Sequence, residues 1–233
     1  MASRSVRLNP GPLDDGATAM ISTQNLTAMP GPTDLRRITE AVAMLDAIVC
    51  PEWEYRYYSF NSKWSDTEAM ASMRNGQGDH WFALFAPTGI AIVGLSHESP
   101  AFRPGDPWPG IFDRLPQAFR ENVLLEPAFD TNNASFCLWR QNADVRWHAG
   151  LAGSDPANAV DGSEEMLAIL EGRPGDYVQF AQEYFEVELS LSAVSSIYNH
   201  EPLSDEIVRS LNPDVTLHLL QRDLSEIGYP IVV

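Results

Sequence analysis

Residues 80–95 read HWFALFAPTGIAIVGL, two apolar runs separated by a short turn sequence. The runs 81–86 and 90–95 are almost wholly apolar, and Pro87-Thr88-Gly89 between them is typical of a tight turn. We therefore predict a β-hairpin over this stretch. Because neither run alternates between apolar and polar residues, each strand needs cover on both faces.

A second hairpin and one further strand complete the expected sheet. Residues 134–140 and 145–149 flank the turn sequence QNAD. The aromatic-rich run 53–60 is expected as an edge strand, because its tyrosine rings can pack while their hydroxyls reach water. The predicted sheet is antiparallel and has about five strands, built from two hairpins plus this edge strand.

Helices are expected before, between and after these strands. The run 33–50 has apolar residues three or four positions apart, as in an amphipathic helix. Ser65 and Glu68 have the spacing of a capping box and Asn75-Gly76 is a typical helix terminator, so we predict a short helix over 66–74. Helical spacing also predicts helices over residues 116–124, 163–170, 177–186, 204–211 and 213–227. The fold class is therefore α+β, with an antiparallel sheet covered by helices and a helical C-terminal third.

Composition and charge divide the chain into three parts. Residues 1–32 are expected to be a flexible leader, because they bury too little apolar surface to offset the entropy of ordering. Residues 33–150 form the predicted α+β sheet domain, and 151–233 form an acidic helical region that packs on the same core. The chain has 32 acidic and 15 basic residues, and the last part holds 15 of the acidic and 3 of the basic ones. It therefore carries most of the net charge of −17.

This charge pattern and the lack of long apolar runs exclude several classes of function. A strongly acidic chain is repelled by phosphate backbones, so we expect no nucleic-acid partner. No run of 18 apolar residues occurs, so we expect no membrane partner. The two cysteines, Cys50 and Cys137, lie in apolar stretches, which favours a reducing cytoplasm over a disulfide-rich secreted scaffold.

The strongest candidate site lies at the ends of the first hairpin. His97 and Glu98 follow its second strand and lead into the irregular loop 98–110, of a kind that often binds ligands. Asp79 and His80 precede its first strand, so a closed hairpin brings all four side chains to one rim. There His97 is the candidate general base, oriented by Glu98. The alternative is that these groups only hydrogen-bond the loop backbone.

The second hairpin carries candidate anion-binding residues. Arg146 and His148 could extend the rim as an anion clamp, because guanidinium pairs well with carboxylate or phosphate. The alternative is that they pair with acidic residues on the sheet. No closely spaced histidine pair, nucleophile-elbow motif or phosphate-binding glycine loop occurs, so we expect no metal and no cofactor.

Acidic residues of the last part form a candidate docking surface. We select Glu183, Glu186, Asp205 and Glu206, because complementary charge accelerates encounter with a basic partner and helps to select it. The alternative is that they are only the solvated faces of amphipathic helices. The aromatic run 53–60 likewise has two interpretations, a recognition surface or ordinary sheet packing.

The segment 173–180, RPGDYVQF, carries a short family resemblance. Its proline, tyrosine and phenylalanine are arranged in a way that resembles a segment of SMI1/KNR4-type bacterial immunity proteins. The resemblance covers eight of the 233 residues. It implies an immunity-type role in a bacterium.

These features support three functional hypotheses. The first is a cytoplasmic, non-enzymatic binding protein of the immunity, regulator or adaptor type, which engages a basic protein partner through its acidic surface. The alternative is a small-molecule enzyme or ligand binder that uses the rim around Asp79, His80, His97 and Glu98. A third is an oligomeric structural component in which the exposed aromatic residues form a self-interface.

Overall fold

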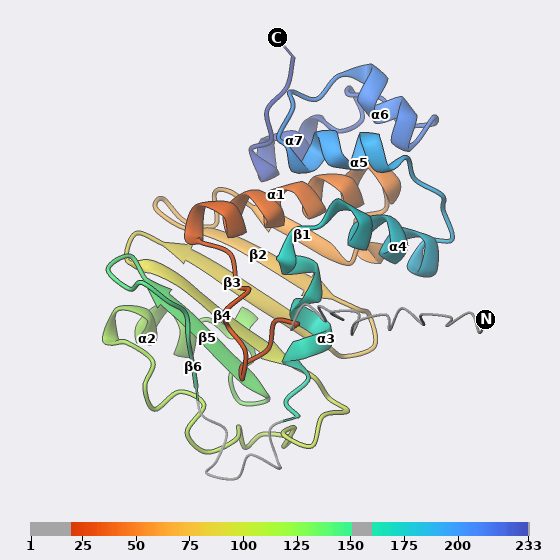
Figure 1. Ribbon diagram of the computed structural model, residues 1–233. Coiled ribbons are helices and arrows are strands. Elements are labelled where there is room, and N and C mark those ends of the chain that lie inside the picture. Colours follow the sequence, from red (N-terminus) through yellow and green to blue (C-terminus); the bar gives the residue numbers. More distant parts are fainter. Residues whose placement is uncertain (1–19, 151–159, 233) are drawn as a thin grey trace, which may run out of the picture.

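The structure is a computed structural model that describes residues 20–150 and 160–232. Within these residues, six antiparallel strands form one sheet, and helices lie on both of its faces (Figure 1). The strands are β1 Tyr58–Asn61, β2 Ala69–Arg74, β3 His80–Ala86, β4 Gly89–Leu95, β5 Phe136–Gln141 and β6 His148–Ala149. The helices are α1 Pro32–Val49, α2 Gln117–Leu124, α3 Ser163–Leu167, α4 Pro174–Tyr184, α5 Leu191–Tyr198, α6 Asp205–Leu211 and α7 Gln221–Ile227, with the 3-10 helices η1 Trp53–Tyr55, η2 Pro127–Phe129 and η4 Ala168–Glu171. The predicted α+β class with an antiparallel sheet and a helical C-terminal third is confirmed.

The sheet is a meander in which each strand pairs with the next strand along the chain. The predicted hairpin of β3 and β4 lies at its centre, where Ala83 pairs with Ile92. Every residue of β4 is buried, as expected for a strand that is covered on both faces. A Cβ atom at Gly89, whose φ is +143°, would lie 2.2 Å from the carbonyl oxygen of Arg140 in β5. The turn therefore requires glycine at this position.

A hydrophobic core lies on each side of the sheet. The first core is formed with α1 and contains alternate residues of β3, including Trp81 and Phe85. Helices α4 to α7 gather around α1 on this side (Figure 1). The second core is formed with α2 and contains Leu84, Val93 and Phe119. Because successive side chains of a strand point to opposite faces of the sheet, neighbouring residues of β3 and β4 pack in different cores.

The segment 66–74, predicted as a helix, contains strand β2 instead. Ser65 and Glu68 do interact, since Ser65 Oγ donates to the Glu68 carboxylate at 3.0 Å, but this bond closes a turn before the strand. Residues 69–73 are all buried, because β2 lies between β1 and β3 with a core on each face. A strand buried on both faces shows no alternation of apolar and polar residues. The helix prediction was therefore wrong, and the sheet has six strands rather than about five.

Other elements differ from the prediction in length. The strand expected over 53–60 begins at Tyr58, and it lies at a sheet edge as predicted. The helix expected over 213–227 is reduced to α7, because residues 213–220 form turns. Helix α5 was not predicted, since its sequence LSAVSSIY combines serines with β-branched residues of low helix propensity. Packing of its apolar face, including Val194, stabilises it.

Residues 20–31 precede α1 and pack on the folded chain. Ile21 is fully buried, and the Trp147 indole N–H donates to the Pro30 carbonyl oxygen at 2.8 Å. The Thr23 hydroxyl donates to the Asp161 carboxylate at 2.5 Å. This part of the expected leader is therefore held by specific contacts. Residues 1–19 lie outside the described residues.

Two further observations concern membranes and thiols. In the described ranges, no helix is both long enough and apolar enough to cross a bilayer. Cys50 and Cys137 are both buried and form no disulfide. Burial raises the pKa of the Cys137 thiol far above its usual value, so this side chain packs as a small apolar group.

Candidate functional site

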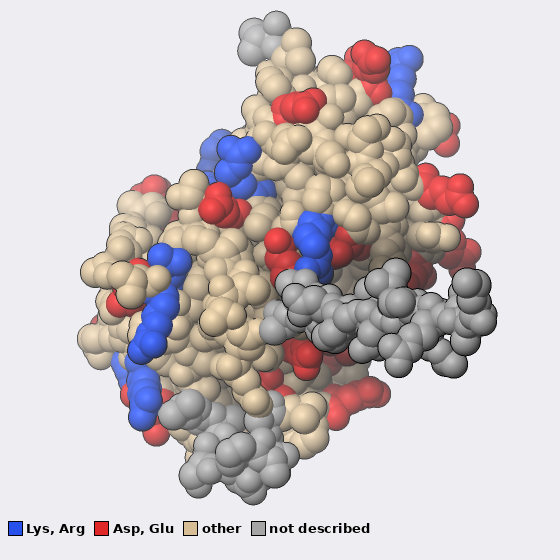
Figure 2. Space-filling view, viewed as in Figure 1, with Lys and Arg blue, Asp and Glu red and all other residues tan. Residues whose placement is uncertain are grey.

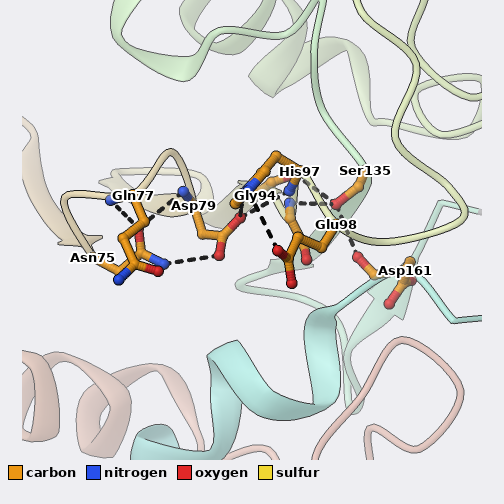
Figure 3. Close-up of polar contacts among 9 residues, drawn as sticks. Asn75, Gln77, Asp79, Gly94, His97, Glu98, Ser135 and Asp161 are labelled. Atoms are coloured by element: carbon orange, nitrogen blue, oxygen red, sulfur yellow. Dashed lines mark hydrogen bonds and ion pairs between the residues drawn. The ribbon is translucent and has the colours of Figure 1, made fainter.

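The central hairpin brings Asp79 and His97 together at one end of the sheet. Asp79 precedes β3, His97 follows β4, and the pairing of His80 with Leu95 places these strand ends side by side. Asp79 Oδ1 accepts a hydrogen bond from the backbone N–H of His97 at 2.8 Å and lies 2.6 Å from His97 Nδ1. Figure 3 shows that Asp79, rather than Glu98, takes the orienting position beside the imidazole.

The turn between β2 and β3 holds the Asp79 carboxylate in place. Asn75 Nδ2 donates to Asp79 Oδ2 at 2.8 Å, and Asn75 Oδ1 accepts from the backbone N–H groups of Gln77 and Asp79 (Figure 3). Burial raises the pKa of the Asp79 carboxyl, but hydrogen bonds from His97 and Asn75 outweigh burial and hold this pKa below its usual value. An ionised Asp79 accepts the Nδ1–H of His97, and in the neutral imidazole Nε2 is then the proton acceptor.

The other two predicted rim residues do not join this pair. Glu98 is 87% exposed, and its Oε1 atom is 3.9 Å from His97 Nε2, too far for a hydrogen bond. His80 lies on the face of β3 that is covered by α2, where its ring contacts Phe82 with a centroid distance of 5.3 Å. Its Nε2 atom is buried without a hydrogen-bond partner in the described part of the chain, and burial lowers the pKa of this imidazole.

Arg146 and His148 lie away from His97. His148 pairs with Trp139, and Trp139 pairs with Ala91, toward the opposite end of β4. The His148 ring stacks on Trp139 and lies 3.7 Å from a carboxylate of the adjoining turn. Arg146 is exposed in the connection between β5 and β6. The expected anion clamp is therefore not assembled beside the rim.

An open groove runs from Asp79 along α3 to the end of α4. Its main cavity, of about 570 Å³, is bordered by Tyr57, α3 and α4. A smaller cavity of about 70 Å³ contains Asp79 and shares Tyr57, Tyr58 and Glu165 with the main one. A third and larger cavity, of about 770 Å³, shares Met20 and Glu165 with the first one. We call these three neighbouring cavities the acidic groove, whose charged and aromatic residues are Tyr57, Tyr58, Asp79, Asp161, Glu164, Glu165, Arg173, Asp176, Phe180, Glu183 and Tyr184.

Carboxylates dominate the charge of the acidic groove. Of its charged residues in the described part of the chain, six are acidic and one, Arg173, is basic. Arg173 is engaged internally, because it pairs with Glu171 and its Nε lies 2.9 Å from the Asp176 carboxylate. Glu183 accepts only a neutral amide hydrogen bond, and Glu165 has no hydrogen bond or ion pair among residues 20–150 and 160–232. Figure 2 shows several acidic side chains around α3 and α4, while basic side chains lie on the β6 side and at a few other places on this face.

An aromatic cluster forms one wall of this groove. The Tyr57 ring contacts the rings of Phe180 and Tyr184, each with a centroid distance of 4.9 Å, and Phe180 stacks on Tyr184 at 5.5 Å. Tyr184 remains 42% exposed. Burial, with added repulsion from Tyr184 and Glu165, raises the pKa of Tyr57 to about 12. The wall therefore presents neutral phenols and exposed ring surface beside ionised carboxylates.

A buried carboxylate behind the wall joins three elements. Asp46 of α1 is fully buried and accepts hydrogen bonds from the backbone N–H groups of Tyr57 (2.8 Å) and Tyr58 (2.7 Å). Its other oxygen accepts from the Tyr177 hydroxyl of α4 at 2.7 Å. Burial raises the pKa of Asp46 to about 7, although these three donors oppose the rise. Asp46 thereby fixes the start of β1 and α4 relative to each other.

The predicted acidic docking residues do not form one patch. Glu183 alone of the four lines the groove, and Glu186 is exposed just after α4 with a φ of +57°. Asp205 and Glu206 lie in the first turn of α6, where Asp205 Oδ1 accepts from the Leu217 N–H at 3.1 Å. Helix α5 lies between α4 and α6 (Figure 1). The two pairs of residues therefore serve different surfaces.

Several groove residues were not selected from the sequence. Asp176, Phe180 and Tyr184 are spaced four residues apart and so follow one face of α4. That spacing is a signal that could have identified the wall. Glu165 belongs to the acidic residues of the C-terminal part, but its position beside α4 depends on the tertiary fold.

Neither the search for metal-binding groups among the described residues nor the comparison with known proteins assigns a function. No group of three or more histidine, cysteine, aspartate or glutamate side chains in the described ranges is arranged to hold a metal ion. Comparison with protein families, with curated proteins and with solved structures finds no match. The acidic groove and the Asp79–His97 pair are therefore the features on which a function is proposed.

Proposed function

We propose that the protein is a non-enzymatic binding protein whose acidic groove engages a basic protein partner. The observation that carries this proposal is an open cavity of about 570 Å³ that combines exposed aromatic surface with carboxylates that no cation neutralises among the described residues. Arginine and aromatic residues are enriched among the residues that dominate binding energy at interfaces. A cationic side chain that enters this groove gains both charge pairing and apolar contact.

Electrostatics further supports a protein partner of opposite charge. The net charge of −17 repels nucleic acid and attracts cationic surfaces over the range of the Debye length, about 10 Å at 0.1 M salt. The more specific form of the proposal is a bacterial immunity-type, regulator or adaptor role in the cytoplasm. The two cysteines support this compartment, because both are buried thiols and neither is bridged.

Fluorescence anisotropy with a labelled peptide of alternating arginine and lysine tests the proposal. We expect binding at about 50 mM NaCl that weakens steeply toward about 500 mM, because salt screens exposed charge pairs. The double variant Glu165→Gln/Glu183→Gln should weaken binding more than Glu121→Gln/Glu206→Gln. The second pair removes the same charge at exposed sites on α2 and α6. Equal effects of the two pairs would exclude the groove as the binding surface.

A second candidate function is a small-molecule enzyme or ligand binder that uses His97. The observation in its favour is the 2.6 Å contact between Asp79 and His97 Nδ1, which is the arrangement that orients a general base. A library of small organic anions and esters, screened by thermal shift, tests this alternative. A compound that raises the Tm of the native protein but not that of His97→Ala would support it, and equal shifts in both proteins would count against it.

A further inference from the structure

We propose that the acidic groove selects arginine over lysine in its partner, with the guanidinium lying against Tyr184 between Glu165 and Glu183. This inference rests on the proposed function and specifies the side chain that the groove recognises. All three residues border the main cavity, Glu165 from α3 and the other two from the end of α4. The site is therefore built from two elements and not from one helix surface.

Three acidic residues and one basic residue of the described chain line the main cavity, so it has a net negative charge that favours a cation. Arg173 is already paired with Glu171 and Asp176, with its Nε 2.9 Å from an Asp176 oxygen. Glu183 accepts only the Gln179 side-chain amide, at 2.8 Å, and so keeps its negative charge. Together with Glu165 it supplies two carboxylates for a ligand.

The aromatic wall favours a guanidinium group over an ammonium group. The rings of Tyr57, Phe180 and Tyr184 touch one another at centroid distances of 4.9–5.5 Å, so no ammonium group can enter between them. Tyr184 packs against Tyr57, Phe180 and Phe185 and is still 42% exposed, so it is the wall residue whose surface a ligand can reach. A planar, weakly hydrated guanidinium packs on such a surface and still directs several N–H donors outward, whereas an ammonium is compact and strongly hydrated.

The chain itself contains the same type of contact. Arg173 uses different nitrogens for Glu171 and Asp176, so one guanidinium bridges two carboxylates at the rim of the groove. A partner arginine would bridge Glu165 and Glu183 in the same manner while Tyr184 supports its plane. A lysine ammonium in this position would contact the carboxylates but would gain little from the ring.

Anisotropy with labelled hexa-arginine and hexa-lysine, measured on the full chain at about 50 mM NaCl, tests the inference. We expect hexa-arginine to bind about three- to tenfold more tightly than hexa-lysine. Tyr184→Leu should reduce hexa-arginine affinity about two- to fivefold and leave hexa-lysine affinity unchanged, whereas Tyr184→Phe should preserve the preference because it keeps the ring. Tyr55→Leu is the matched control, since Tyr55 is 61% exposed outside the groove.

The outcomes separate this inference from the proposed function. Equal affinity for both peptides, or an arginine preference that Tyr184→Leu does not reduce, overturns the inference. If binding of both peptides is still weakened by Glu165→Gln/Glu183→Gln, the proposed function stands. If neither peptide binds, or if Glu165→Gln/Glu183→Gln acts no more strongly than Glu121→Gln/Glu206→Gln, both fail. Urea denaturation of each variant establishes that the fold is retained.

Discussion

Tyr177→Phe removes a single oxygen from the buried junction behind the groove wall. In the native chain this hydroxyl donates to Asp46 Oδ1 at 2.7 Å, and both side chains are fully buried. The phenylalanine ring fills the same space, so the substitution isolates one hydrogen bond. It leaves the bonds from the Tyr57 and Tyr58 backbone to the other Asp46 oxygen in place.

The size of the loss should depend on pH, because Asp46 has a pKa of about 7 in the folded protein. At pH 8 the carboxylate is mostly ionised, and a hydrogen bond to a charged group contributes about 1.5–3 kcal/mol. At pH 5 the carboxyl is mostly protonated, and a neutral hydrogen bond contributes about 0.5–1.5 kcal/mol. We therefore expect Tyr177→Phe to reduce the free energy of unfolding more at pH 8 than at pH 5.

Urea denaturation followed by circular dichroism at the two pH values measures this difference. Tyr198→Phe is the matched control, because the Tyr198 hydroxyl is buried without a hydrogen-bond partner among the described residues. Its removal should leave stability unchanged or slightly raised at both pH values. A loss for Tyr177→Phe that is equal at both pH values, or larger at pH 5, would refute the assigned ionisation of Asp46.

Three other predictions concern the same structural features. Between about pH 4 and pH 7, the free energy of unfolding of the native chain should contain a contribution that falls as pH rises, because folded Asp46 retains a proton that the unfolded chain has lost. Asp46→Asn should remove this contribution, as measured by urea denaturation across that pH range. His97→Ala should raise the pKa of Asp79, measured by NMR titration of its carboxyl carbon, since the carboxylate loses the side-chain hydrogen bond that helps to lower this pKa; an unchanged titration would contradict the pairing. Gly150→Ala should destabilise the fold by about 1–3 kcal/mol or more, because the added Cβ would lie 1.8 Å from the Ile111 carbonyl oxygen. A variant with the same Tm as the native chain would show that the backbone of Ile111 does not approach Gly150 so closely.

The central hairpin was predictable from the sequence, whereas β2 was not. The runs that form β3 and β4 are long, apolar and separated by a recognisable turn, so the local sequence predicts the same hairpin that burial in the core stabilises. Strand β2 is equally buried, but its sequence AMASMR lacks β-branched residues and follows a capping-box spacing. This segment forms a strand because it pairs with β1 and β3, and the sequence of the segment alone does not show that pairing.

The candidate site was likewise predictable only in part, because some of its contacts depend on the tertiary fold. Closure of the hairpin correctly predicted that Asp79 and His97 meet. Which face His80 occupies depends on strand alternation relative to the two cores, and the sequence of a strand buried on both faces does not mark those faces. The groove was beyond local prediction, because Tyr57 and Tyr184 are brought together only when α4 docks on the sheet.

The meander order of the sheet has a consequence for how the protein is made. Strands β1 to β4 follow one another through short connections, so their pairing costs little loop entropy, whereas residues 96–135 separate β4 from β5. Ring contacts between Tyr57 and α4 form only after residues 174–184 have left the ribosome. We therefore expect β1 to β4 to pair early in synthesis, whereas the aromatic wall of the groove forms only after α4 has been made.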